Sequence, residues 1–222
     1  MISHGTLTRV FDTVYLVLMT NLLLVASCLP VVLVLVTTDP ARSWGLLAVV
    51  LPLLAPAFTA ATVVFAEHSG AGGGPVLRTF AAAWRTHLWR SLRVGAAATA
   101  ALVVIAVDIR FTSPTRIGAV AVPVLLVLAV LVLLTAVVTL VAVPERPDVP
   151  VARLVRASLF LGLRRWYLTG ASLAVLVLLA AVTAGRPAIG LGLAAAPLLY
   201  VVWANSRFAL RPILPPTDPP RK

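Results

Sequence analysis

The chain has 222 residues, of which 61% are hydrophobic and only 11% are charged, and its mean hydropathy is +1.06. About a quarter of the residues of an ordinary soluble domain are charged, so this balance excludes such a domain and indicates lipid as the solvent. The net charge is +11, but the basic residues are dispersed between apolar blocks, which argues against a nucleic acid partner. Anionic lipid headgroups fit this charge better. The single cysteine, Cys28, excludes a disulfide framework and a cysteine-based metal site.

Six apolar blocks could cross a hydrocarbon core of about 30 Å, which needs about 20 helical residues. The blocks are 14–36, 44–66, 91–111, 117–143, 168–184 and 188–206. We therefore predict an all-α fold, a polytopic transmembrane helical bundle of about six spans that forms a single membrane domain over residues 1–211. The fifth block is short and the sixth is rich in glycine, so one re-entrant hairpin in their place would leave four full crossings.

The distribution of basic residues predicts an orientation. Fourteen of the 18 lie before the first block, after the second, after the fourth, or at the C-terminal end, and four lie in the alternate loops. Because Lys and Arg concentrate in cytoplasmic loops, we expect both termini in the cytoplasm. The excess of Ala, Val, Leu and Arg is typical of a GC-rich bacterial genome, which makes the inner (plasma) membrane of a bacterium the expected location.

The first block has an alternative interpretation. Arg9, followed by an apolar stretch that ends at Ser27 and Cys28, resembles a lipoprotein signal peptide with its lipidated cysteine. Cleavage there would leave a chain that begins Cys28-Leu29-Pro30-Val31 and is still apolar, whereas a signal h-region is about 7 to 15 residues long and then gives way to polar sequence. An uncleaved first span is therefore expected.

Two cytoplasmic segments have an amphipathic pattern. In residues 75–93, apolar residues recur every three or four positions, with arginines largely opposite and Trp89 on the basic side. This pattern predicts an interfacial helix that lies at the headgroups and enters the third span. A second basic segment covers residues 150–167. The side chains expected to dock lipid or a protein partner are Arg78, Trp84, Arg85, Arg90, Arg93, Arg153, Arg156, Arg164 and Arg165.

The two basic segments are similar at an offset of 75 residues. This offset matches Arg90 with Arg165 and Gly95 with Gly170, and gives eight identities in 23 ungapped positions. The similarity predicts two parallel hairpins that carry equivalent basic helices. Chance similarity between two Arg-rich entries into the membrane is the alternative. Beyond the last span, residues 212–222 contain five prolines and are expected to form a disordered, Pro-rich cytoplasmic tail.

Residues that could carry chemistry are sparse. All seven acidic residues lie at span ends or in loops, which argues against a proton- or cation-coupled transporter. The three histidines are scattered, and neither a phosphate-binding glycine loop nor a nucleophile elbow is present. We therefore expect no catalytic, cofactor-binding or metal-binding residues. The polar or helix-distorting residues within the spans, which could serve packing or contact a solute, are Asn21, Pro30, Pro56, Thr59 and Thr62.

Short motifs in the first half of the chain carry a family resemblance. They are Asn21-Leu22-Leu23 with Leu29-Pro30, then Ala55-Pro56-Ala57-Phe58-Thr59-Ala60, then Phe80 with Trp84-Arg85, and Ser91-Leu92-Arg93-Val94-Gly95. In this order they resemble the YesL-like family of bacterial membrane proteins, a domain of unknown function. One departure is the polar loop around Asp39-Pro40, which separates Pro30 from Pro56. The resemblance implies a link to carbohydrate uptake without identifying an activity.

These observations together favour a non-enzymatic accessory component that works beside transport machinery. Its basic helices would dock anionic lipid or a protein partner, and a sugar transporter subunit is the partner that the resemblance implies. A small-solute permease with its path between the two helical hairpins is the alternative. An intramembrane enzyme ranks third.

Overall fold

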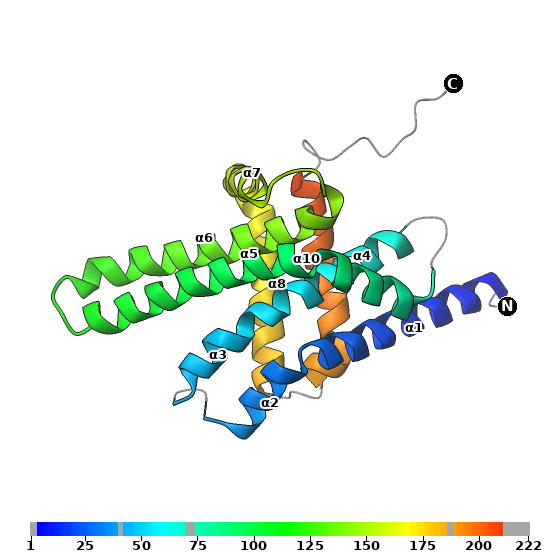
Figure 1. Ribbon diagram of the computed structural model, residues 1–222, viewed down its shortest axis with the longest axis horizontal. Helices are drawn as coiled ribbons and strands as arrows, with labels where there is room; N and C mark the ends of the chain where they lie inside the picture. The colour runs from blue at the N-terminus through cyan, green and yellow to red at the C-terminus, as the bar shows by residue number, and fades with distance from the viewer. Residues whose placement is uncertain (1–3, 40–41, 70–73, 186–188, 211–222) are drawn as a thin grey trace.

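The computed structural model describes residues 4–39, 42–69, 74–185 and 189–210 (Figure 1). Over these ranges the chain is helical and has no strand, so the predicted all-α fold is confirmed. The predicted Pro-rich tail, 212–222, lies outside the described residues. The helices are α1 His4–Ser27, α2 Leu29–Thr37, α3 Trp44–Val50, the 3₁₀ turn η1 Leu51–Leu53, α4 Leu54–His68, α5 Val76–Thr112, α6 Gly118–Glu145, α7 Val151–Arg164, α8 Trp166–Gly185, the π turn η2 Gly190–Ala194, and α10 Ala195–Leu210.

Four stretches in the described residues are long and apolar enough to cross a membrane: Trp44–His68, Val76–Thr112, Gly118–Glu145 and Gly192–Leu210. The bent pair α1 and α2 makes a fifth if it crosses as one span. These stretches coincide with five of the six predicted blocks. The remaining block, 168–184, forms α8, whose apolar part from Gly170 to Thr183 is shorter than a full crossing. By length and composition the count is thus four or five instead of six.

The first predicted span is sharply bent. Helices α1 and α2 meet at Cys28 with an angle of 67° between them. Pro30 lies in the first turn of α2 and has no N–H to donate to the carbonyl of Ala26, so the helical hydrogen-bond ladder is interrupted at this point. The bend therefore lies next to the proline that interrupts the helix.

Helix α4 forms the centre of the core. Ala57, Ala60, Ala61 and Val64 have no exposed surface, and α4 contacts α1, α5, α6 and α10. Small side chains let neighbouring backbones approach closely, which is how helices associate where lipid supplies no hydrophobic driving force between them. Gly95 of α5 is part of this packing, because a β-carbon there would lie 2.7 Å from the β-carbon of Ala55.

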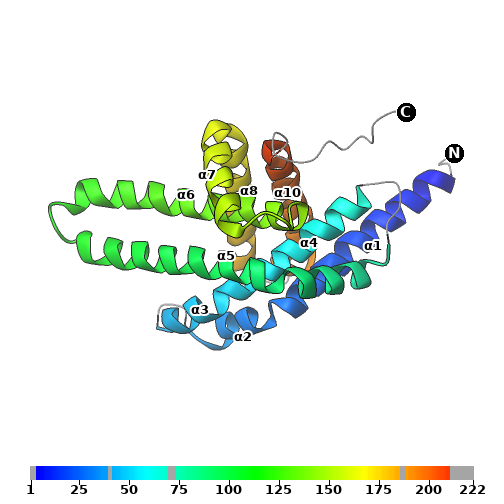
Figure 2. The same cartoon turned by 45° about the horizontal axis from the view of Figure 1, so that its top comes forward.

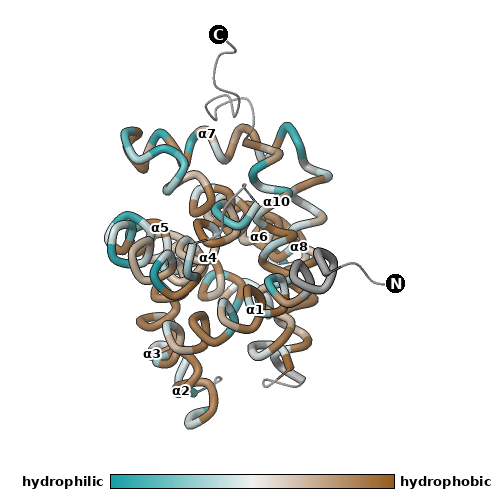
Figure 3. Tube along the Cα trace, turned by 90° about the vertical axis from the view of Figure 1, so that its right-hand side faces the viewer, coloured by the Kyte–Doolittle hydropathy of each residue, from teal (hydrophilic) through white to brown (hydrophobic). Residues whose placement is uncertain are grey.

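The helices do not form a bundle of parallel rods. Helices α5 and α6 form a long antiparallel hairpin that projects from the core, and α1 and α4 pack near its base (Figure 1). Helices α8 and α10 pack along each other and cross this hairpin instead of running beside it (Figure 1 and Figure 2). Helix α7 lies across one end of the α8 and α10 pair. Most of the chain is apolar, with polar stretches at α7 and at the start of α5 (Figure 3).

The first basic segment enters the third predicted span, as expected, and its apolar face also packs on the protein. Residues 76–93 continue into the third predicted span as one helix, α5, without a break. Their apolar face packs on the protein and not only on lipid, because Phe80 is 3% exposed and Trp84 packs against the buried core. The second basic segment is a separate helix, α7, because the backbone leaves the helical region at Arg165, where φ is −116° and ψ is 46°. The two segments thus have different local structures.

Candidate functional site

Asn21 joins α1 to the irregular start of the last helix. Its side chain is 1% exposed, its Nδ2 donates to the carbonyl oxygen of Gly192 at 2.9 Å, and its Oδ1 accepts from the backbone N–H of Ala196 at 2.7 Å. Both partners lie at the π turn η2 and the first turn of α10, where the regular helical hydrogen bonds are interrupted. The buried amide therefore satisfies backbone groups that lipid could not.

A buried polar chain links three helices at Thr59. The hydroxyl of Ser91 on α5 donates to the hydroxyl oxygen of Thr59 on α4 at 2.9 Å, and the Thr59 hydroxyl reaches the carbonyl oxygen of Leu140 on α6 at 3.5 Å. That carbonyl lacks its helical donor because Pro144, four residues later, has no N–H. The Thr62 hydroxyl donates to the carbonyl oxygen of Thr59 at 2.7 Å.

The five intramembrane residues singled out from the sequence do not form one pocket. Thr59 and Thr62 belong to the polar chain, whereas Asn21 holds the start of α10. Pro56 is buried in the first turn of α4, and Pro30 is exposed in the first turn of α2, just after the bend. Sequence reasoning missed Ser91 and Pro144. The sequence alone could have indicated Pro144, because a proline near the end of a helical span leaves the carbonyl four residues earlier without its hydrogen-bond donor.

One outward surface of α5 is basic. Arg78, Arg85 and Arg93 are exposed, and they lie on the same side of the helix as Trp89, which is 69% exposed. We call Arg78, Arg85, Trp89 and Arg93 the α5 basic face. Trp84 lies on another side of the helix, where it is half-buried and packs against the core. Its buried indole Nε1 has no hydrogen-bond partner.

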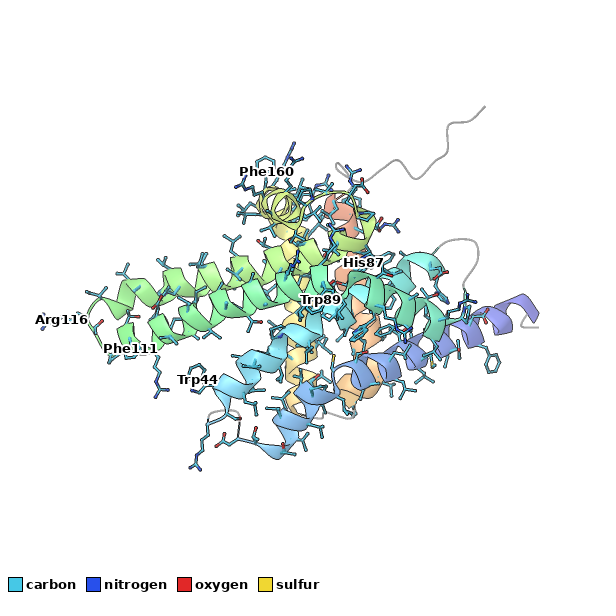
Figure 4. The ribbon with its side chains drawn as sticks, viewed as in Figure 1. Trp44, His87, Trp89, Phe111, Arg116 and Phe160 are labelled. Atoms are coloured by element: carbon cyan, nitrogen blue, oxygen red, sulfur yellow. The ribbon has the colours of Figure 1, made fainter. Side chains whose placement is uncertain are left out.

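Helix α7 has a similar outward surface. Leu154, Ser158 and Leu161 form its buried stripe, which packs mainly on α6. On the opposite side, exposed arginines alternate with exposed apolar side chains, and Phe160 lies at the outer edge of the molecule (Figure 4). Phe160 is 65% exposed and Leu163 is 57% exposed. We call this surface the α7 basic face; it consists of Arg153, Arg156, Phe160, Leu163 and Arg164.

Two of the arginines expected to dock a partner bind the chain itself. The guanidinium of Arg90 donates to three carbonyls of the α6–α7 connection: Pro147 at 2.6 Å, Val149 at 2.5 Å and Arg146 at 3.4 Å. Arg165 donates to the carbonyl oxygen of Phe208 at 2.8 Å, and its guanidinium lies 5.1 Å from the centroid of the Phe208 ring. The nine predicted residues therefore divide into six outward arginines, two anchoring arginines and one inward tryptophan.

The ends of α4, α6 and α10 line a half-open cavity of about 170 Å³. An ion pair between Arg207 and Glu145 lies on its wall, with 3.3 Å between Nε and Oε1. The guanidinium of Arg207 lies 5.4 Å from the centroid of Trp203, a residue that is 4% exposed. The cavity is lined by Thr62, Val63, Ala66, Val141, Pro144, Glu145, Trp203 and Arg207. Sequence reasoning counted Glu145 and Arg207 only as charges at span ends, and no local pattern pairs them.

The part of the chain that the structure describes contains no cluster of side chains that could bind a metal ion. No three side chains among His, Cys, Asp and Glu there are placed to hold a metal ion.

Comparison with known proteins finds a family model that matches part of the chain. The model of a family described as "Protein of unknown function, DUF624" matches residues 17–109, from within α1 to near the end of α5. The matched segment contains every motif on which the resemblance seen in the sequence rests. No curated protein and no solved structure matches the chain.

Proposed function

We propose that this protein is a non-enzymatic accessory component of the bacterial plasma membrane that docks a transport system through its α5 and α7 basic faces. The observation that carries the proposal is the outward placement of six arginines, interleaved with exposed Trp89 and Phe160. The two remaining arginines of the basic segments are already engaged with backbone carbonyls. The surface thus offers positive charge that the fold itself does not use.

The arrangement of helix ends supports a topology with both termini in the cytoplasm. The start of α1, the start of α5, α7 and the end of α10 lie toward the top and right of Figure 1. The α5–α6 turn, the end of α2 and the start of α3 lie toward the left and bottom. The ends that carry most of the arginines therefore lie apart from the ends that carry few, as the positive-inside rule requires.

The chemistry of the two faces suits a membrane boundary. A basic side chain near an anionic membrane surface contributes about 1 kcal/mol to binding, and aromatic side chains favour the headgroup region. Among the described residues, no acidic side chain forms a salt bridge with any of the six outward arginines. Anionic headgroups can therefore supply their counter-charges, as can an acidic surface on a partner protein at the same depth.

The proposal of a sugar transporter subunit as the partner rests on the resemblance to YesL-like proteins. The match to a family of unknown function over residues 17–109 supports that resemblance in α1 to α5. The YesL-like name and the link to carbohydrate uptake go beyond this match and are part of the proposal.

The test compares co-purification from native membranes between two triple variants. One variant replaces Arg78, Arg85 and Arg93 by Gln, and its control replaces Arg42, Arg110 and Arg116, which are also exposed but lie at the opposite helix ends. We expect mass spectrometry to identify a transporter subunit with the wild type and the control, and at least a tenfold loss with the basic-face variant. Recovery of only the self-associated protein from wild-type membranes would contradict the proposal.

A small-solute permease is the second candidate function. The cavity between α4, α6 and α10 is the observation that favours it. If purified protein in liposomes accelerates the uptake of a sugar or another small solute, the permease replaces the accessory role.

A further inference from the structure

The cavity at the ends of α4, α6 and α10 has room for more than a water molecule. Its volume of about 170 Å³ corresponds to about six waters at roughly 30 Å³ each. Val63, Ala66 and Val141 form apolar wall, while Glu145 and Arg207 supply opposite charges within 3.3 Å of each other. This size and this lining match a small polar group that carries charge, and exceed what one bound ion needs.

The ion pair is partly withdrawn from water. The side chain of Glu145 is 20% exposed and that of Arg207 is 31% exposed. Removing charges from water costs free energy that their mutual attraction only partly offsets, so such a pair is weak evidence for a purely stabilising role. Two packed apolar side chains could join α6 and α10 equally well. The charges at the cavity wall therefore indicate a role other than stabilising the fold.

The charged wall is held in place by an aromatic cluster. Trp203 lies beneath the guanidinium of Arg207 and packs against Tyr200 and Phe65, with ring centroids 5.2 Å and 6.1 Å away. Phe65 and Tyr200 contact each other edge to face at 5.4 Å. A guanidinium stacked on a buried ring keeps its donors in a fixed plane, which suits the recognition of a phosphate or a carboxylate.

The electrostatics of the site favour a ligand with both charges. A purely anionic ligand would pair with Arg207 and leave Glu145 without its partner in a half-buried place, and a purely cationic ligand would do the reverse. A molecule that carries an ammonium and an acidic group replaces both partners at once. Helices α4, α6 and α10 all end near the cavity, and the partial negative charge of these C-terminal ends favours an ammonium there.

From these observations we infer that the cavity binds a zwitterion with a primary ammonium and a phosphate, with the ammonium on Glu145 and the phosphate on Arg207. The headgroup of an ethanolamine phospholipid and soluble phosphoethanolamine both have this chemistry. Glu145 is the last residue of α6, directly before the connection to which Arg90 is hydrogen-bonded, so the cavity lies beside the α6–α7 connection. The site is separate from the α5 and α7 basic faces and does not depend on their function.

The test measures retained lipid by native mass spectrometry after purification from vesicles with equal amounts of ethanolamine, choline and glycerol phospholipids. Choline lipid presents no N–H to Glu145, and glycerol lipid has no ammonium. We expect at least a tenfold preference for the ethanolamine lipid, lost in Glu145→Gln and in Arg207→Gln. The double variant Asp39→Asn with Arg42→Gln is the matched control, because it removes an exposed ion pair of 3.9 Å elsewhere, and it should retain the preference.

A second arm separates the two sources of the ligand. If soluble phosphoethanolamine raises the melting temperature of the wild type but not that of Glu145→Gln, the site takes a free zwitterion; retention of ethanolamine lipid without this effect identifies the lipid. If Arg207→Gln does not fold, Arg207→Lys replaces it in the test, because lysine keeps the positive charge. We expect this variant to retain a reduced preference for the ethanolamine lipid. Equal retention of all three lipids by the wild type, together with no response to phosphoethanolamine, would overturn the inference.

Discussion

Single buried residues in this protein act mainly on the backbone of neighbouring helices. Asn21 bonds to a carbonyl and an N–H around η2, and Thr59 reaches the carbonyl that Pro144 deprives of its donor. In lipid no water can take over such bonds, so each irregular turn needs a polar side chain close by. The sequence showed which residues are unusual in an apolar span, but their partners lie more than 80 positions away for Thr59 and Leu140, and 171 for Asn21 and Gly192.

Two glycines that the 75-residue offset matches give a direct test at this scale. A β-carbon at Gly95 would lie 2.7 Å from the Ala55 β-carbon and 2.9 Å from the Pro52 carbonyl oxygen, whereas at Gly170 it would meet nothing within 4 Å. We expect Gly95→Ala to destabilise the fold by about 1 to 3 kcal/mol through overpacking. Gly170→Ala should leave the stability unchanged or slightly higher. Thermal unfolding in detergent measures both, and equal melting temperatures would refute the close contact of α5 with η1 and α4.

At the scale of elements, hydropathy predicted which segments are helical but not where helices break. Nothing in the sequence distinguishes the entry at Ser91, where α5 continues, from Arg165, where α7 ends, since neither place has a proline or a glycine cluster. The spacing of arginines likewise predicted a basic face, but it did not show that Arg90 binds the chain itself whereas Arg93 is exposed. Only the position of the α6–α7 connection, which is 56 residues or more from Arg90 in sequence, turns that side chain inward.

The anchoring role of Arg90 leads to a prediction for the α6–α7 connection. Arg90→Gln removes a charged donor from three carbonyls, and we expect a loss of about 2 kcal/mol in stability, because hydrogen bonds to charged groups contribute about 1.5 to 3 kcal/mol. The amide hydrogens of Arg146, Asp148 and Val149 in this connection should also exchange faster. Arg93→Gln, which changes an exposed arginine one turn away, is the control and should alter neither property. Unchanged exchange in Arg90→Gln would show that these contacts do not hold the connection.

For the whole molecule, length and hydropathy were sufficient to predict an all-α membrane protein, and five of its six blocks coincide with helical stretches that can cross a membrane. They were not sufficient to predict that α8 and α10 cross the α5–α6 hairpin (Figure 2), because crossing angles depend on which small residues meet between helices. The cavity with Glu145 and Arg207 arises from this crossing, since its walls come from three helices distant in sequence. Such a site could not be predicted from one sequence.

In the orientation that we propose, the ends bearing α7 face the cytoplasm and the α5–α6 turn faces outward. Arg116 at the α5–α6 turn and Asp148 before α7 are exposed and suit single-cysteine reporters, whereas a β-carbon at the neighbouring Gly118 would clash with the Thr112 carbonyl oxygen. Each is changed to Cys in a Cys28→Ala background, and intact cells are treated with a membrane-impermeant maleimide. We predict labelling of Arg116→Cys but not of Asp148→Cys until the membrane is opened. Labelling of Asp148→Cys in intact cells, with Arg116→Cys protected, would contradict the account.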